Sequence, residues 1–159
     1  MSAKSEASVA GVEDVGTAKL TALFREAESS PRKRAHLLLH RAPTDQVQRL
    51  LIACCIGTYV RPHYHPEQWE LMSLLKGNAD VITFNADGSV VRRRSMRSAP
   101  VVQISPNVLH TIIITAPRTL LFEVKPGPFR PPEFPPWAPE ENSQGAVRLL
   151  EQLKRPPTN

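Results

Sequence analysis

Short apolar segments that recur about every ten residues limit the possible folds of this chain more than any other feature. Between residues 35 and 124, runs rich in Val, Ile, Leu and Thr alternate with clusters of turn residues. This spacing is typical of an all-β sandwich or barrel, because each run has the length of one strand. We expect strands at Ala35–His40, Val47–His63, Glu70–Leu75, Ala79–Asn85, Val90–Arg94, Val101–Ile104, His110–Thr115 and Thr119–Val124. A hairpin turn is expected at 85–88, where Gly88 is free to take a positive φ.

A helix is expected before the strands and a second one after them. Leu20, Leu23, Phe24 and Ala27 recur at helical spacing, and Pro31 follows, which predicts a helix within residues 13–31. Near the end of the chain, apolar residues at near-helical spacing between 147 and 153 predict a short closing helix.

A proline-rich segment separates the expected strands from the closing helix. Seven of the fourteen residues from Pro126 to Pro139 are proline, so we expect an extended strap whose aromatic side chains, Phe129, Phe134 and Trp137, pack on the barrel. The predicted organisation is a disordered tail at 1–12, a helix at 13–31, a barrel at 32–126, and the strap with its helix at 127–159 packed on that barrel.

Length, charge and cysteine content exclude several classes of protein. A chain of 159 residues suits one domain. The net charge of +5 comes with arginine clusters at 32–34 and 92–97, but no zinc-finger spacing or helix-turn-helix pattern accompanies them, so we expect a solvated basic face and no nucleic-acid partner. The sequence shows no signal peptide and no apolar run of ~18 residues, which predicts a cytoplasmic protein without a membrane partner. Cys54 and Cys55 are adjacent, which is poor geometry for a disulfide, and we expect reduced thiols.

The stretch after the second expected strand carries side chains typical of a metal site. In a strand, His63 and His65 lie two positions apart and project from one face, so one cation can contact both rings. Pro66 interrupts the strand, and a new strand then directs Glu70 into the same cavity. His110 opens another apolar strand and, if its face is the interior one, completes the set. We therefore expect His63, His65, Glu70 and His110 to bind one divalent transition-metal ion.

These residues match the first motif of the cupins, which reads Gly, five residues, His-x-His, four residues, Glu, six residues, Gly. The fixed positions are filled by Gly57, His63, His65, Glu70 and Gly77. The second cupin motif, Pro-x-Gly-x-x-His followed by Asn, is present in part: Pro106-Asn-Val-Leu-His110 lacks the glycine, and Ile114 stands where Asn is usual.

Between about Pro31 and Glu141 the chain more closely resembles the WbuC-type cupin-fold metalloproteins. The resemblance is carried by Pro31-Arg-Lys-Arg-Ala-His36-Leu-Leu-Leu-His40, Val47-Gln-Arg49, Tyr59-Val-Arg61-Pro-His63, Glu123-Val-Lys125-Pro-Gly127-Pro and Trp137-Ala-Pro-Glu140. It implies a cupin double-stranded β-helix, that is, a jelly-roll barrel, which binds a metal and forms a homodimer. Members of this family are often encoded among genes for surface polysaccharide synthesis.

Three further residues are candidates for binding a substrate. Tyr59 and Arg61 have the strand parity of His63 and, together with Arg49, are expected to bind an anionic or hydroxylated small-molecule ligand. Exposure to solvent, with an ion pair to a surface carboxylate, is the alternative for both arginines. Glu70 is the candidate catalytic residue, because it can move a proton.

The ligand set suits Fe, Zn, Mn, Ni, Co or Cu and does not identify the metal. By analogy with the family, the first functional hypothesis is a metal-dependent isomerase, epimerase or dioxygenase acting on a small oxygen-rich substrate such as a sugar or sugar nucleotide in polysaccharide metabolism. The second is a non-catalytic module that binds a small ligand through the metal, and the third is a purely structural metal site.

Overall fold

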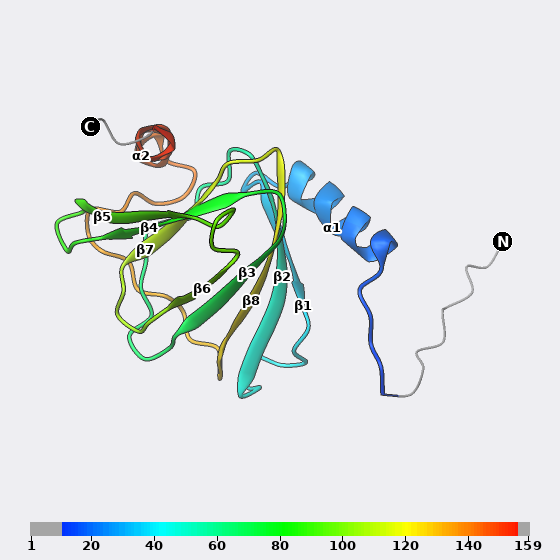
Figure 1. Cartoon of the computed structure of the whole chain (residues 1–159). Coiled ribbons are helices and arrows are strands. Elements are labelled where there is room, and N and C mark those ends of the chain that lie inside the picture. Colours follow the sequence, from blue (N-terminus) through cyan, green and yellow to red (C-terminus); the bar gives the residue numbers. More distant parts are fainter. Residues whose placement is uncertain (1–10, 156–159) are drawn as a thin grey trace.

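The computed structural model of the chain describes residues 11–155, which form eight strands and two helices (Figure 1). The strands are β1 (Arg34–Leu38), β2 (Val47–Cys55), β3 (Glu70–Lys76), β4 (Ala79–Phe84), β5 (Val90–Ser95), β6 (Val101–Ile104), β7 (His110–Ile114) and β8 (Arg118–Pro126). The helices are α1 (Thr17–Ser29) and α2 (Gln144–Lys154). Of the tail expected at 1–12, residues 1–10 lie outside the described part of the chain.

The strands form two antiparallel sheets that face each other. One sheet has the order β1-β2-β8-β3-β6 and the other the order β5-β4-β7. Between them lies a core in which side chains of β2 and β3, such as Ile52 and Met72, meet Val81 of β4 and Ile112 of β7. The expected all-β jelly-roll barrel is therefore confirmed, and the inward-facing residues alternate along each strand as the period of two requires.

Helix α1 covers the outer face of the five-stranded sheet. Its Leu23, Phe24 and Ala27 pack on Leu51 and Ala53 of β2. Because β2 is buried on both faces, its sequence reads as a continuous apolar run instead of an alternating one.

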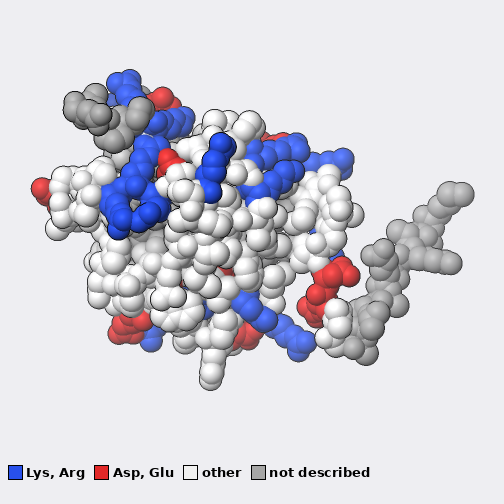
Figure 2. All heavy atoms as spheres, viewed as in Figure 1, with Lys and Arg blue, Asp and Glu red and all other residues white. Residues whose placement is uncertain are grey.

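Helix α2 packs against the outer face of the three-stranded sheet. Leu150 and Leu153 contact a cluster that includes Ile82 and Ile113. At the end of the helix, Arg93 of β5 donates to the carbonyl of Leu153 at 2.6 Å and pairs with Asp80 at 2.7 Å, so it holds this helix in place. Figure 2 shows basic side chains gathered over β5 and α2.

Strand β2 ends at Cys55, whereas the sequence predicted one strand from Val47 to His63. Gly57 has a φ of +95°, and the Thr58 hydroxyl donates to the carbonyls of Lys33 and Cys55, which closes a turn directly after the strand. Residues 58–62 form a connection without regular structure, and the prediction that Tyr59 and Arg61 share a strand with His63 is therefore wrong.

Both glycines at the ends of the first motif lie in turns that need positive φ. Gly77, with a φ of +81°, lies between β3 and β4, and a Cβ atom there would be 2.2 Å from the carbonyl oxygen of Arg118. The motif thus fixes two turns of the backbone in addition to the side chains between them.

Replacing Gly77 by alanine is expected to destabilise the protein by about 1–3 kcal/mol, because both the backbone conformation and the overlap with Arg118 are unfavourable. Urea unfolding of the variant measures this loss. Gly16→Ala is the matched control, since nothing lies within 4 Å of a Cβ at that position. Equal unfolding midpoints for the two variants would contradict this account of the turn.

Neither helix in the described part of the chain is long and apolar enough to cross a membrane. Cys54 and Cys55 are buried and form no disulfide, as expected. Burial raises the pKa of the Cys54 thiol to about 12, so this thiol stays protonated.

Candidate metal centre

The four predicted ligands come from three separate segments and meet at one end of the barrel. Glu70 is the first residue of β3 and His110 the first of β7. His63 pairs with His110 through two backbone hydrogen bonds of 3.0 and 2.9 Å, and this isolated bridge places the His-x-His segment beside β7. Since Ile112 lies in the core between the sheets, His110 faces the interior as the sequence analysis required.

Contacts to two other segments fix the loop between β2 and β3. The carbonyl of His65 accepts from the backbone N–H of Asn107 at 2.9 Å, and Tyr64 exchanges two backbone hydrogen bonds with Glu133 of the strap. The buried amide of Gln68 donates to the carbonyls of Pro126 and Pro128. The loop that carries both histidines is thereby held on both sides.

Three of the four side chains, those of His63, Glu70 and His110, bring their donor atoms together, and His65 lies beside them. The Nε2 atom of His110 lies 2.9 Å from Glu70 Oε2, and the Nε2 atom of His65 lies 3.1 Å from Glu70 Oε1. One donor atom from each of His63, Glu70 and His110 lies within 4.8 Å of the others. The His65 ring is adjacent, with its centroid 5.2 Å from that of His63. His65, Glu70 and His110 are at most 4% exposed and are shielded from water, whereas His63 is partly exposed.

Backbone carbonyls set the orientation of two rings. The Nδ1 atom of His63 lies 2.8 Å from the carbonyl oxygen of Arg61, and that of His110 lies 2.8 Å from the carbonyl of Val108. Because a carbonyl oxygen only accepts hydrogen bonds, Nδ1 carries the proton in each ring. In the neutral ring, Nε2 then presents a lone pair to the cavity, which is the arrangement that metal-binding histidines use.

Several buried polar atoms of these side chains lack a hydrogen-bond partner, and a metal ion would satisfy them. Within residues 11–155, His110 Nε2, both ring nitrogens of His65 and Glu70 Oε2 have no hydrogen-bond partner although all are buried. Unpartnered buried polar atoms are rare in proteins and need an explanation. His110 Nε2 and the carboxylate oxygen of Glu70 lie 2.9 Å apart, a distance at which the two atoms need either a shared proton or a cation between them.

The electrostatics keep these groups in forms that bind a metal. Burial lowers the pKa of His63 to about 3, and neighbouring His110 contributes to the shift, so the ring stays neutral. Burial by itself would raise the pKa of Glu70, but the imidazoles of His110 and His65 bring it well below its usual range, and the group is a carboxylate.

Two charged residues beside the cluster were missed by the sequence analysis. Lys125 and Glu123 lie on the inner face of β8, with the Lys125 Nζ atom 2.9 Å from Glu123 Oε1 and 3.7 Å from Glu70 Oε1. The sequence did contain a signal for this pair. Leu121, Glu123 and Lys125 are spaced two residues apart, so they lie on one face of the strand, and Leu121 on that face packs in the core.

The structure places the predicted substrate-binding residues outside this cluster. The Tyr59 hydroxyl donates to the carbonyl of Pro139, and the Arg61 Nε donates to the carbonyl of Ala138 while its guanidinium stacks 4.2 Å from the Phe134 ring centre. Arg61 thus ties the strap to the loop just before His63.

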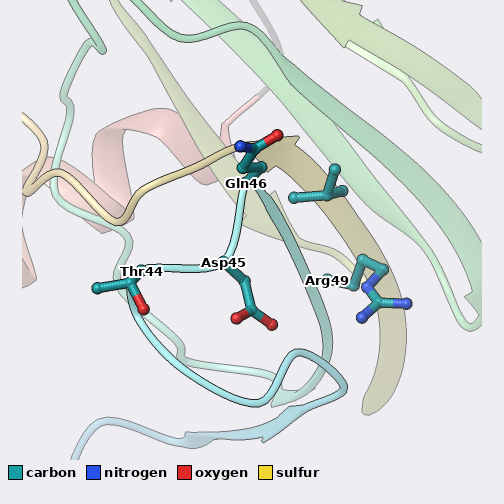
Figure 3. A pocket seen from close by; sticks show the side chains of 5 residues that line it. Thr44, Asp45, Gln46 and Arg49 are labelled. Atoms are coloured by element: carbon teal, nitrogen blue, oxygen red, sulfur yellow. The ribbon is translucent and has the colours of Figure 1, made fainter.

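Arg49 lies on the opposite face of β2 from Leu50, which packs in the core. It is exposed and lines a surface hollow together with Thr44, Asp45, Gln46 and Val47 (Figure 3). Within the described structure, the side chain of Arg49 has a hydrogen bond only to the carbonyl of Leu39. It does not join the histidine cluster.

A cavity of about 600 Å³ adjoins the segments that carry the histidines. Its walls include Tyr64, which follows His63, Val108, whose carbonyl orients His110, and Phe134, whose ring centre is 6.4 Å from that of His63. The walls are mostly apolar, which is usual for sites that bind small molecules.

Solved structures share the fold with this chain at low sequence identity. A recombinant oxalate oxidase in complex with glycolate is 16% identical with a TM-score of 0.53, and the match covers 67% of this chain and 57% of the other. An oxalate decarboxylase formate complex from Lactobacillus farciminis is 17% identical with a TM-score of 0.51, covering 64% and 31%. The capsular polysaccharide assembling protein CapF from Staphylococcus aureus is 14% identical with a TM-score of 0.57, covering 66% and 30%.

This chain therefore spans less than two thirds of the length of each of these proteins. The shared structure supports the cupin jelly-roll fold that the motif predicted. No curated protein sequence matches the chain. A family described as "Domain of unknown function (DUF6016)" matches residues 15–96, which is more than half of the 159 residues. The chain belongs to this DUF6016 family and has the cupin fold.

Proposed function

We propose that His63, His65, Glu70 and His110 bind one divalent transition-metal ion and that the site acts on a small oxygen-rich substrate. The observation that carries this proposal is the group of buried, unpartnered nitrogen and oxygen atoms that face one another at the end of the barrel. Such a group is costly without a cation and is stabilised by one.

Three imidazoles and one carboxylate suit Fe, Mn, Ni, Co, Cu or Zn in the divalent state. When bound, such an ion supplies Lewis-acid or oxygen-activating chemistry to a substrate. The chain's own residues have separate roles in this proposal. The carbonyls of Arg61 and Val108 orient His63 and His110. Glu70 would leave the metal to take up a proton from the substrate, because its lowered pKa disfavours protonation while it is a ligand.

The finer assignment is to a sugar or sugar nucleotide in surface polysaccharide metabolism. It is supported by the resemblance to WbuC-type proteins and by the fold that the chain shares with a capsular polysaccharide assembling protein. The expected homodimer rests on the same resemblance. A module that binds such a ligand without turnover is the alternative, and an assay of sugar nucleotides with the metal-loaded protein separates the two.

Metal analysis of the purified protein tests the proposal directly. We expect about one equivalent of metal per chain in the natural protein and less than a tenth of that in the double variant His63→Ala, His65→Ala, since two of the four ligands are lost. The double variant His36→Ala, His40→Ala removes the same number of imidazoles outside the cluster and is expected to keep its metal. Equal metal content in the two double variants would rule out the proposed ligand set.

A further inference from the structure

A lysine lies largely out of solvent beside the proposed metal ligands, where a cation is unexpected. The Lys125 side chain is 13% exposed, and its Nζ atom lies between the carboxylates of Glu123 and Glu70 at 2.9 and 3.7 Å. The amino group is thus held between two acidic side chains at the edge of the proposed metal site. A metal site made of the four predicted ligands does not need this group.

The pair formed by Lys125 and Glu123 is not explained by stability. Burying an ion pair costs the desolvation free energy of both charges. A protein with well-packed apolar residues of the same volume in their place is often as stable or more stable. Leu121, two positions earlier on the same face of β8, shows that this strand accommodates an apolar side chain in the core. The two charges are confined to the end of the strand that lies beside Glu70.

The charges beside the proposed ligands favour an anion once a metal is bound. Among the described residues, Glu70, Glu123 and Lys125 form the buried charge cluster, and the histidines are neutral when they act as ligands. Two carboxylates and one ammonium carry a net charge of minus one, which a divalent ion changes to plus one. Protonation of Glu123 would only add to the positive charge. A monoanion neutralises this excess in a region shielded from water, where charges interact strongly.

We propose that Lys125, held in place by Glu123, binds the carboxylate of a small organic acid that occupies the metal-loaded site. This inference rests on the proposed function and adds the substrate class, a hydroxy acid or sugar acid with a single negative charge. Arg61, which the sequence indicated for this role, is already engaged with Ala138 and Phe134. The Lys125 ammonium, 3.7 Å from Glu70, is a compact charge within reach of an anion beside that ligand.

Calorimetric titration of the zinc-loaded protein with glycolate tests the inference, with methyl glycolate as the neutral comparison. We expect glycolate to bind at least about tenfold more tightly than its ester, and about 10- to 100-fold more weakly to the double variant Glu123→Gln, Lys125→Met than to the natural protein, as is usual for a lost charged hydrogen bond. The double variant removes one charge of each sign, so the net charge of the cluster and the packing volume are kept.

Two controls make the outcome decisive. Lys76→Met removes an exposed lysine of β3 and is expected to leave glycolate binding unchanged. Zinc stoichiometry is measured on every sample. Equal glycolate affinity in the natural protein and the double variant, with one zinc in each, would overturn the role of Lys125 and leave the metal centre intact. Failure of the natural protein to bind zinc would overturn the proposed function and this inference together.

Discussion

Replacing Glu70 by glutamine is expected to weaken zinc binding by about 100-fold or more. Mutation of groups that merely orient metal ligands already costs about 10- to 100-fold in affinity, and Glu70 is the one carboxylate of the proposed ligand set. The amide keeps the shape of the side chain but removes its negative charge, so it no longer offsets the charge of the ion. Competition with a chromophoric chelator at constant pH measures the change.

Glu133→Gln is the matched control for this substitution. Glu133 is an exposed carboxylate that accepts a hydrogen bond from the Tyr64 hydroxyl, and it lies near the same segment without joining the cluster. We expect it to change zinc affinity by less than about twofold. If Glu70→Gln and Glu133→Gln bind zinc alike, then Glu70 is not a ligand, and the convergence seen in the structure has another cause.

The strands could be predicted from the sequence because their signals are local. Short apolar runs and the turn residues between them located all eight strands, and the Gly88 turn has the positive φ that was expected. The end of β2 was missed because the chain stays apolar and β-branched as far as Val60. The turn at Gly57 depends on hydrogen bonds from Thr58 to Lys33 and Cys55, and the first of these partners is distant in sequence.

The grouping of His63, Glu70 and His110 could also be predicted, since two of them have fixed spacing in the motif and the third opens a strand. The charged pair on β8 was not predicted, because the strand was interpreted as an apolar run and its two inward charges were not considered separately. The positions of Tyr59 and Arg61 depend on carbonyls of Pro139 and Ala138, some eighty residues further along the chain. No local spacing encodes such contacts.

Zinc is expected to raise the free energy of unfolding by about 4 kcal/mol at a free concentration 1,000 times its dissociation constant. The ligands come from the β2–β3 loop, the start of β3 and the start of β7, so they are brought together only in the folded chain. Unfolding separates them and releases the ion, and binding therefore stabilises the native state. Urea unfolding with added zinc and with a chelator measures the difference.

His110→Ala is expected to lose most of this stabilisation, because it removes a ligand that is 1% exposed and lies 2.9 Å from Glu70. The quantity compared is the effect of zinc within each protein, so that any change in the stability of the metal-free variant cancels. His40→Ala is the control. The His40 ring contacts the backbone of Arg49 in β2 and lies outside the cluster, so this variant should respond to zinc like the natural protein. A full zinc response in His110→Ala would mean that the ion stabilises the fold from another site. A site that has lost one of its buried ligands binds zinc more weakly in the folded chain and therefore stabilises that chain less.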